Sequence, residues 1–318
     1  MMKDIVSLEE SQIAKSVFYG GNAGAKEAII HENSVWMIKY PKTTRDLSNP
    51  QISYTTSPLS EYIASKIYKS LKIPVHEVIL GVRKKKIVVA CKDFTREIET
   101  GNEIKILKPR LLIPFHDLKN NFMSSDLEEY SGTGSETILE EVLDTLTGEA
   151  TLKSIKDADK RFWDMFIVDA FIGNSDRNNG NWGLLWHVFD GSLTLAPVYD
   201  NGNGFYNKRS LKQMEKRLSD EKMMKEDAYG TPVSVYKYKG LDNEGHRIKS
   251  FEFIEKTEIL ACRLALQRFL DNVDMNLIRD IINEIPESKG VLAVMPEIQK
   301  KFYIRLLEIR LDRLQSIV

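Results

Sequence analysis

The sequence lacks most of the features that mark a specialised class of protein. It has two cysteines among 318 residues, Cys91 and Cys262, which stand far apart in apolar or helical surroundings. This pattern fits neither a zinc site nor a disulfide scaffold, and it predicts reduced core thiols in a reducing compartment. No run approaches the roughly 20 apolar residues of a membrane span. The first residues show no apolar stretch of a cleavable signal, so we expect a cytoplasmic protein, with translocation by another route left open.

The sequence also lacks an excess of charge of either sign. Lys and Arg total 45 against 46 Asp and Glu, which gives a formal net charge of -1. Near-neutrality argues against a protein that holds nucleic acid mainly through its phosphates, so we expect no direct nucleic-acid partner. The five histidines are scattered without ligand-like pairing, and we expect structural or surface roles for them. The chain has 42% hydrophobic and 29% charged residues, the balance of a globular protein, and is long enough for two lobes.

The first ~95 residues are predicted to form a small sheet that carries one helix. Apolar positions recur at helical spacing from Ser57 onward, and Pro74 ends this helix. Strands are expected at Lys26–Ile30, Val35–Lys39, Val75–Val82 and Lys86–Cys91. The expected order is therefore β-β-α-β-β.

The remainder is predicted to be mostly helical. Helices are expected at Thr137–Leu146, Lys153–Ile172, Lys256–Val273, Met275–Ile285 and Pro296–Ile317. A Gly/Asn-rich loop follows Ile172, and a strand pair, Trp182–Trp186 and Leu193–Val198, comes after it. A strand-rich part before a larger helical part predicts an α+β fold of two lobes, at residues 1–94 and 95–318.

The stretch with the clearest chemical pattern is residues 172–182, IGNSDRNNGNW. Phosphoryl transfer needs a carboxylate that orients the attacking hydroxyl and accepts its proton, and an oxygen ligand for Mg²⁺ close by. Asp176 and Asn181 supply both, in the Asp-x-x-x-x-Asn spacing of kinase catalytic loops. Taken alone, the stretch also fits a set of turns in which Asp176 is a cap.

A second carboxylate, Asp200, follows the next predicted hairpin and precedes Gly202. At the end of a strand it could lean into a cleft and bridge Mg²⁺ to phosphate oxygens. As an isolated tripeptide this is an ordinary turn. Its place one hairpin after the Asp176 loop gives it weight, because kinases use that order.

Three weaker signals lie upstream in the order that kinases use. Lys39 ends an apolar strand, where it could pair with the α- and β-phosphates, and Glu61 on the helix is its candidate partner. The glycine-rich stretch 19–26 (YGGNAGAK) could cradle phosphate with backbone N–H groups, although it departs from the Gly-x-Gly-x-x-Gly and Walker patterns. Residues 88–94 leave the first lobe, either as an adenine-binding connector or as a plain linker.

In this fixed order the residues resemble the HipA-like serine/threonine kinases. The stretches that carry the resemblance are 59–62 (LSEY), 87–94 (IVVACKDF), 162–166 (FWDMF) and 173–183 (GNSDRNNGNWG). The resemblance covers nearly the whole chain and is weakest between Glu97 and Asp157. It is greatest to the compact members without the small N-terminal subdomain of the toxin-type enzymes. It implies a two-lobed, protein-kinase-like fold and ATP- and Mg²⁺-dependent transfer to protein hydroxyls, including autophosphorylation.

The resemblance also implies roles for single residues. Asp176 would be the catalytic base, Asn181 and Asp200 the magnesium ligands, and Lys39 a catalytic, phosphate-binding lysine. Arg177 follows the aspartate, as in HipA-like and lipid kinases. An antitoxin-like regulator would follow by family analogy alone. The implied nucleotide-binding residues are Gly21, Asn22, Ala23, Gly24, Ala25, Lys26, Lys39, Glu61, Lys92, Asp93, Phe94, Asn181 and Asp200.

Two alternatives remain open beside a protein kinase. A lipid or small-molecule kinase would share the Asp-Arg-x-x-x-Asn order, and residues 208–217 are then the candidate membrane-facing segment, unless they form a solvated helix face. A catalytically silent, nucleotide-binding interaction module is the second. The joint presence of Lys39, Asp176, Asn181 and Asp200 argues against it, because crowding two carboxylates is sensible only beside a cation. The protein substrate itself has no signature in the sequence.

Overall fold

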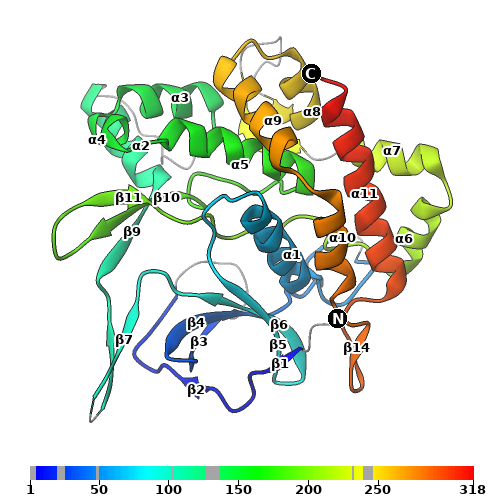
Figure 1. The fold of residues 1–318 in the computed structure, drawn as a ribbon, viewed down its shortest axis with the longest axis horizontal. Coiled ribbons are helices and arrows are strands. Elements are labelled where there is room, and N and C mark those ends of the chain that lie inside the picture. Colours follow the sequence, from blue (N-terminus) through cyan, green and yellow to red (C-terminus); the bar gives the residue numbers. More distant parts are fainter. Residues whose placement is uncertain are drawn as a thin grey trace.

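The chain divides into a β-rich part and a larger helical part. In Figure 1 the β-rich part lies at the bottom and the helical part above it. The structure, a computed structural model, describes residues 5–19, 26–47, 50–101, 103–126, 137–230, 233–238 and 246–318. Within these ranges, no helix is long and apolar enough to cross a membrane.

The β-rich part is built on a six-stranded sheet with the strand order β1-β5-β6-β4-β3-β2. Its strands are β1 (Val6–Ser7), β2 (Gln12–Ile13), β3 (Lys26–His31), β4 (Ser34–Lys39), β5 (Val78–Arg83) and β6 (Lys86–Lys92). The predicted hairpins are present as β3–β4 and β5–β6. Both turns use two residues with positive φ, Glu32 and Asn33 in one and Lys84 and Lys85 in the other, as tight hairpins of two-residue turns require.

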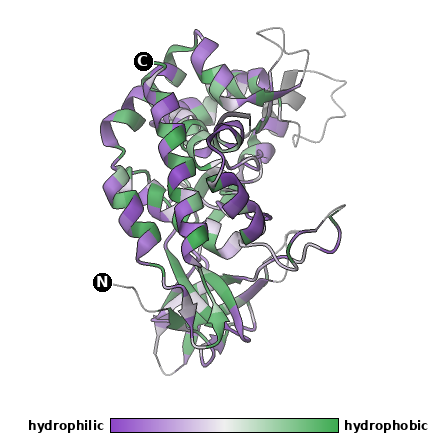
Figure 2. Cartoon of the chain, turned by 90° about the vertical axis from the view of Figure 1, so that its right-hand side faces the viewer, coloured by the Kyte–Doolittle hydropathy of each residue, from purple (hydrophilic) through white to green (hydrophobic). Residues whose placement is uncertain are grey.

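The two faces of this sheet bury different residues, as expected from the alternation of side chains along a strand. Leu80, Val89 and Cys91 face helix α1 (Ser57–Ser70) and join the main core of the molecule. Ile38 and Val88 belong to a separate, smaller core with their neighbours on the other face. Figure 2 shows the predominantly hydrophobic strands of this sheet at the bottom of the molecule.

Helix α1 is bonded to the helical part of the chain at both ends. Before it, the backbone N–H of Thr56 donates to the carbonyl of Asn207 at 2.8 Å, and within its first turn Ser60 Oγ donates to the carbonyl of Gly204 at 3.1 Å. After it, Pro74 and His76 pair with the two sides of Val198, at 2.9 and 3.0 Å. The predicted strand Val75–Val82 therefore starts late, at Val78, because its first residues pair with Val198 instead.

The helical part surrounds helix α5, which is buried along most of its length. Its helices are α2 (Phe115–Asp126), α3 (Leu139–Gly148), α4 (Ala150–Ser154), α5 (Ala158–Ile172), α6 (Leu211–Leu218), α7 (Glu221–Gly230), α8 (Ser250–Lys256), α9 (Leu260–Asn272), α10 (Met275–Asn283) and α11 (Glu297–Gln315). A three-stranded sheet, β11-β10-β9, comprises β9 (Arg110–Pro114), β10 (Gly183–His187) and β11 (Leu193–Leu195). The remaining hairpins pair β7 (Glu97–Thr100) with β8 (Ile104–Leu107), β12 (Val233–Lys237) with β13 (Arg247–Lys249), and β14 (Ser288–Lys289) with β15 (Leu292–Ala293).

Two of the predicted helices are interrupted near their starts. The helix predicted at Lys153–Ile172 is interrupted, since α4 ends at Ser154 and α5 starts at Ala158. Asp157 between them has φ +65°, a left-handed conformation that no helix can continue through. The helix predicted at Lys256–Val273 starts at Leu260, because Lys256 is the last residue of α8 and the chain turns between the two helices.

Candidate active site

The loop that carries Asp176 starts at the end of helix α5. Gly173 ends the helix with φ +74°, a conformation in which glycine is the usual residue. The guanidinium of Arg310, from α11, lies 2.8 Å from the point where a Cβ on Gly173 would sit. Both conformation and space therefore require glycine here, and the polar loop leaves the helix at a fixed angle.

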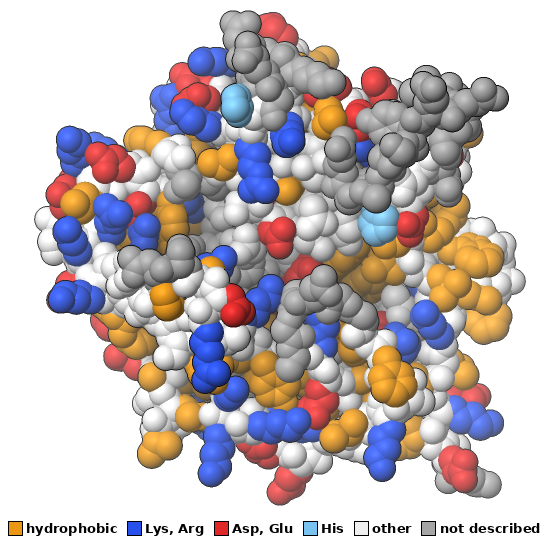
Figure 3. All heavy atoms as spheres, turned by 180° about the vertical axis from the view of Figure 1, so that it is seen from behind, with side chains coloured by type: hydrophobic (Ala, Val, Ile, Leu, Met, Phe, Trp, Pro, Cys, Tyr) orange, Lys and Arg blue, Asp and Glu red, His pale blue; other side chains and the backbone are white. Residues whose placement is uncertain are grey.

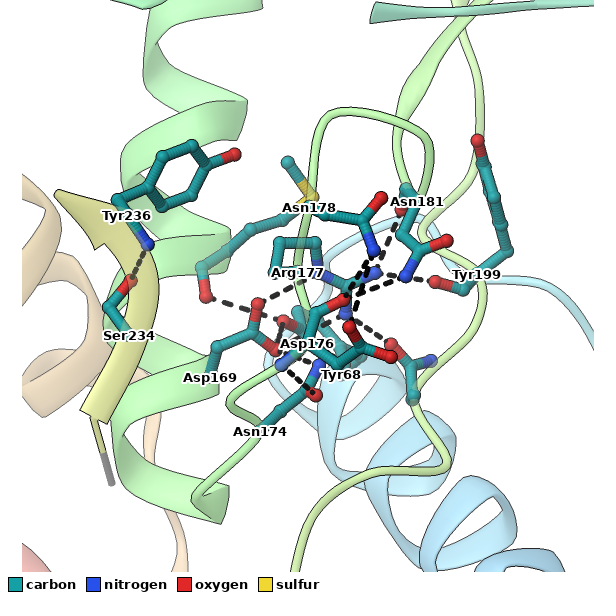
Figure 4. A network of polar contacts seen from close by, with 12 residues as sticks. Tyr68, Asp169, Asn174, Asp176, Arg177, Asn178, Asn181, Tyr199, Ser234 and Tyr236 are labelled. Atoms are coloured by element: carbon teal, nitrogen blue, oxygen red, sulfur yellow. Dashed lines mark hydrogen bonds and ion pairs between the residues drawn. The ribbon is translucent and has the colours of Figure 1, made fainter. Parts of the chain in front are cut away.

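Arg177 is the buried centre of this loop (Figure 4). Its guanidinium donates to the carboxylate of Asp169 in α5, at 2.8 and 3.2 Å. It also donates to the carbonyls of Asn181 and Tyr199, and to the amide oxygen of Asn201. Burial alone would lower the pKa of Arg177, but Asp169 raises it, so the side chain stays charged. Arg177 thereby fixes the loop against the segment that contains Asp200.

The carboxylate of Asp169 accepts hydrogen bonds from three neighbouring side chains. Besides Arg177, its carboxylate accepts the hydroxyl of Tyr68 at 2.8 Å and the amide of Asn174 at 3.0 Å. All of these side chains are buried. Satisfied buried networks of this kind rigidify the elements that they join, here α1, α5 and the loop.

Asp176 and Asn181, by contrast, present their polar groups outward. Asp176 is exposed, and its backbone N–H donates to the Asn174 amide oxygen at 3.2 Å. The amide nitrogen of Asn181 donates to the backbone carbonyl of Asp176 at 2.7 Å, which turns its amide oxygen away from that bond. The loop thus offers one carboxylate and one amide oxygen on the same short stretch.

Lys39, Glu61, His76 and Asp200 form a second group, which we call the lysine cluster. Lys39 Nζ lies 2.8 Å from Glu61 Oε2 and 3.0 Å from Asp200 Oδ1, so that strand β4, helix α1 and the segment after β11 meet at one ammonium group. Glu61 is 1% exposed, and its other oxygen accepts the backbone N–H of Asn201 at 2.9 Å. His76 Nε2 lies 3.0 Å from that same oxygen.

The charges of the lysine cluster stabilise one another. Burial would raise the pKa of Glu61, but Lys39 and His76 hold it well below its usual range. The ammonium of Lys39 likewise lowers the pKa of Asp200. Burial would lower the pKa of Lys39, and the two carboxylates raise it well above its usual value. The site therefore holds the charged, partly buried Lys39 between two carboxylates at neutral pH.

The backbone at Asp200 is unusual. Its φ is +59°, in the left-handed region that residues other than glycine, asparagine and aspartate rarely adopt. Two residues later, a Cβ on Gly202 would come within 3.1 Å of Glu61 Oε2, so the Asp-x-Gly spacing leaves room for the buried glutamate. The Asp200 side chain is 40% exposed, which leaves its carboxylate open to solvent beside Lys39.

The other predicted nucleotide-binding residues are only partly covered. Gly21, Asn22, Ala23, Gly24 and Ala25 lie outside the described residues. Lys26, the first residue of β3, is half-buried; burial lowers its pKa, and Asp200 opposes that shift. It therefore lies within electrostatic reach of the lysine cluster.

The side chains of the predicted connector are engaged locally. Lys92 Nζ pairs with Glu77 at 3.0 Å on the surface. The Asp93 carboxylate accepts the hydroxyl of Tyr19 at 2.8 Å and pairs with Arg96 at 2.6 Å. The ring of Phe94 lies 5.8 Å from that of Tyr199, next to Asp200. Contacts of this connector with a ligand would therefore come from its backbone rather than from Lys92 or Asp93.

The donor set fits a hard divalent cation. Asn181 supplies an amide oxygen and Asp200 a carboxylate, both of which Mg²⁺ accepts. Arg177 bonds the carbonyl of Asn181 and that of Tyr199, the residue before Asp200, so one buried side chain positions both donors. Figure 3 shows the face behind Figure 1, hollowed between the helical part and the sheet, with charged side chains beside the hollow.

Three functional neighbours were not predicted from the sequence. His76 completes the lysine cluster, and Asp169 with Tyr68 supports Arg177. Donor atoms of Glu61, His76 and Cys91 lie within 4.8 Å of one another, and the ammonium of Lys39 supplies the positive charge beside Glu61 there. No motif signals these residues; the signal available for Asp169 was a carboxylate within the otherwise apolar second half of α5, residues 165–172.

These features define a kinase-like protein: a small sheet with one helix, a larger helical part, and a lysine, a glutamate and an aspartate gathered next to an Asp-x-x-x-x-Asn loop. The chain belongs to the HipA-like C-terminal domain family, whose model matches residues 16–275. It is 32% identical over 296 residues to the serine/threonine-protein kinase CtkA of Helicobacter pylori, covering 93% of this chain and 82% of that protein.

Solved structures agree with the family. The crystal structure of the H. pylori proinflammatory kinase CtkA matches 98% of this chain and 97% of its own with a TM-score of 0.83 and 30% identity. HipA of Shewanella oneidensis, solved with HipB and operator DNA, matches 93% of this chain and 64% of its own with a TM-score of 0.56 and 13% identity, which shows a shared fold. The predicted family, its compact type and the two-lobed α+β fold are therefore confirmed.

Proposed function

We propose that this chain is a protein serine/threonine kinase that transfers the γ-phosphate of ATP to protein hydroxyls, its own included, with Mg²⁺. The observation that carries the proposal is the meeting of Lys39, Glu61 and Asp200 at one partly buried ammonium group. Its position next to a loop that exposes Asp176 agrees with the order of kinase active sites. The serine/threonine-protein kinase at 32% identity supports the same reaction.

The proposed roles follow from the contacts. Residues 1–94 would hold the nucleotide, with residues 21–26 around its phosphates and the backbone of Lys92–Phe94 at its adenine. Lys39, oriented by Glu61, would bind the phosphates. Asn181 and Asp200 would hold Mg²⁺, which offsets the charge of the phosphate oxygens when bound.

Residues 95–318 would supply the acceptor side. Asp176 is exposed, so its carboxylate can accept a hydrogen bond from an acceptor hydroxyl and orient its oxygen. Asn178 donates to Asp176 Oδ1 at 3.3 Å, which limits the rotation of the carboxylate. Proton transfer to Asp176 as the hydroxyl reacts is the step that this chain itself performs.

The segment considered for membrane contact is a packed helix. Residues 208–217 run into α6, which starts with a capping box at Ser210 and Gln213 and buries Met214. The other residues of α6 are exposed or partly buried, and Leu211 is the only exposed apolar side chain among them. This described helix therefore has no exposed apolar face. This favours protein over lipid acceptors. The antitoxin-like regulator and the cytoplasmic or translocated location stay predictions.

Incubation of the purified protein with γ-labelled ATP and Mg²⁺, with and without a generic protein acceptor, tests the proposal. We expect label on protein that disappears with chelator and in Asp176→Asn, and label on Ser or Thr after mapping. Measurable ATP binding without label on protein would contradict it, and would point to a small-molecule or lipid acceptor or to a catalytically silent module.

A further inference from the structure

A pocket of about 400 Å³ opens beside the Asp176 loop. Five segments far apart in the sequence line it: the loop between β4 and α1, the start of the Asp176 loop, the chain after Asp200, the start of β12, and α11. The lining residues are Leu47, Gln51, Gly173, Ser175, Asn203, Tyr206, Asn207, Lys208, Arg209, Gln213, Val233 and Arg310. None of these described residues has a role in the phosphate and metal site proposed above.

The pocket is positively charged. Lys208, Arg209 and Arg310 line it, and among the described residues of its lining none is acidic. Arg209 pairs with Asp227, but Arg217 binds the same carboxylate at 3.1 Å, so one negative charge serves both guanidinium groups and also acts on that of Arg310. These five side chains together leave an excess of three positive charges.

Arg310 is buried and held in place by its neighbours. Its guanidinium donates to the backbone carbonyls of Phe171 and Ala228, at 3.1 and 3.3 Å, and these acceptors are neutral. Burial lowers the pKa of Arg310 to about 10, and Asp227 and Tyr206 oppose that shift. An anion in the pocket would add to the effect that Asp227 has on this guanidinium.

Lys208 lies at the open side of the pocket. Its side chain is exposed, and the structure shows no ion pair for it within the described residues. An approaching anionic chain would meet Lys208 before the buried guanidinium groups.

The pocket is adjacent in sequence to both proposed catalytic carboxylates. Ser175 directly precedes Asp176, and Asn203 follows Asp200 by three residues. The two walls are bonded to each other, since the Asn203 amide donates to Ser175 Oγ at 3.1 Å. An extended peptide advances about 3.3–3.6 Å per residue. A residue a few positions from the phosphorylated hydroxyl would therefore reach the pocket.

We propose that this pocket selects protein acceptors with an anionic side chain, carboxylate or phosphate, within a few residues of the acceptor hydroxyl. The proposal rests on the proposed function for the identity of the acceptor, but not for the binding of the anion. Lys208, Arg209 and Arg310 are the residues that would determine this specificity.

The first experiment compares serine peptides that carry Glu, phosphoserine, Ala or Lys at each position from three before to three after the acceptor. Labelled transfer is measured with the unmodified protein, Lys208→Glu, and the matched control Lys212→Glu, an exposed lysine of α6 outside the pocket. We expect kcat/KM to favour Glu or phosphoserine over Ala by about three- to tenfold, and Lys208→Glu to abolish this preference. Lys212→Glu should keep it. The same preference in Lys208→Glu, or none in the unmodified protein, would overturn the proposal.

The second experiment does not depend on transfer. Fluorescent peptides with Ala in place of the acceptor Ser, and with Glu, phosphoserine or Lys at the best position, are titrated against the same three proteins at two salt concentrations. We expect the anionic peptides to bind at least threefold more weakly to Lys208→Glu, and salt to weaken their binding to the unmodified protein. If the protein binds anionic peptides more tightly but transfers no phosphate, the proposal for the pocket holds and the kinase proposal is wrong. If the protein transfers phosphate but does not prefer anionic peptides, the proposal for the pocket is wrong and the kinase proposal holds.

Discussion

The two halves of the candidate site are prepared in different ways. In the lysine cluster the reactive groups themselves are paired: Lys39 contacts two carboxylates, and Glu61 is almost fully buried. In the Asp176 loop the supporting groups are paired instead, and Asp176 remains exposed. Under the proposed function, the group that would attract phosphate is set by neighbouring charges, whereas the one that would meet an acceptor is held through its backbone and left accessible.

This contrast is tested most strongly at Asp176. Because its side chain supports little of the structure, Asp176→Asn should leave the fold and ATP binding unchanged while transfer falls by about 10²–10⁴-fold. Single-turnover transfer and fluorescent nucleotide binding, measured on the same preparation, check this. A variant that transfers phosphate at a near-normal rate would show that another group accepts the proton.

Arg177 should behave in the opposite way. Replacing it by Met leaves the buried Asp169 carboxylate without its cation, which destabilises proteins by about 3–5 kcal/mol. Urea unfolding at pH 7 measures the loss, with Asp176→Asn as the control of unchanged stability. If the midpoint of Arg177→Met were unchanged, the loop would not depend on this pair.

Glu61 sharpens the comparison through pH. Its pKa is lower in the folded protein than in the unfolded chain, so its contribution to stability is present above about pH 4.3 and is lost as the pH falls through the folded value. Glu61→Gln should cost about 1.5–3 kcal/mol at pH 7, and its difference from the unmodified protein should shrink in acid.

Thermal unfolding of both proteins from pH 7 to pH 3 measures that difference. Asp200 shares Lys39 with Glu61 and would titrate differently in the two proteins, so both are compared in an Asp200→Asn background. Parallel curves for the two proteins across this range would contradict the role of Glu61 as a buried counter-ion.

The smallest effect is expected at Tyr68. Tyr68→Phe removes one hydroxyl from Asp169, which keeps Arg177 and Asn174, so the free energy of unfolding should fall by about 0.5–1.5 kcal/mol. Transfer should stay within about twofold, because the loop keeps its other bonds. A loss of transfer much greater than twofold, with the expected small loss of stability, would show that α1 controls the loop through this hydroxyl.

Local patterns in the sequence were enough to predict the hairpins and the main helices. The β3–β4 hairpin and the apolar face of α1 follow from the alternation and spacing of neighbouring residues. The contact between Lys39 and Glu61 was also predicted and is present, while its role in binding nucleotide stays a prediction.

Contacts between distant residues could not be predicted in this way. Tyr68 and Asp169 stand 101 positions apart and His76 contacts Glu61 across the start of a new strand, so no periodicity links them. Helix α7 was missed, and α6 was considered only as the solvated helix face of residues 208–217, because half of the residues in these helices are charged and few are buried. The break at Asp157 depends on one left-handed residue, which a helical pattern does not reveal.

The attachment of α1 has a mechanical consequence. Thr56, at the start of α1, is hydrogen-bonded to Asn207, and Pro74 and His76, beyond its end, are hydrogen-bonded to Val198. Helix α1 is therefore fixed to the larger lobe at both ends. Any hinge opening between the lobes would then move strand β4 while Glu61 and Asp200 stay together. The distance from Lys39 to Glu61 and Asp200 would therefore measure how far the two lobes have closed. Helix α1, which carries Glu61, would not move relative to the larger lobe.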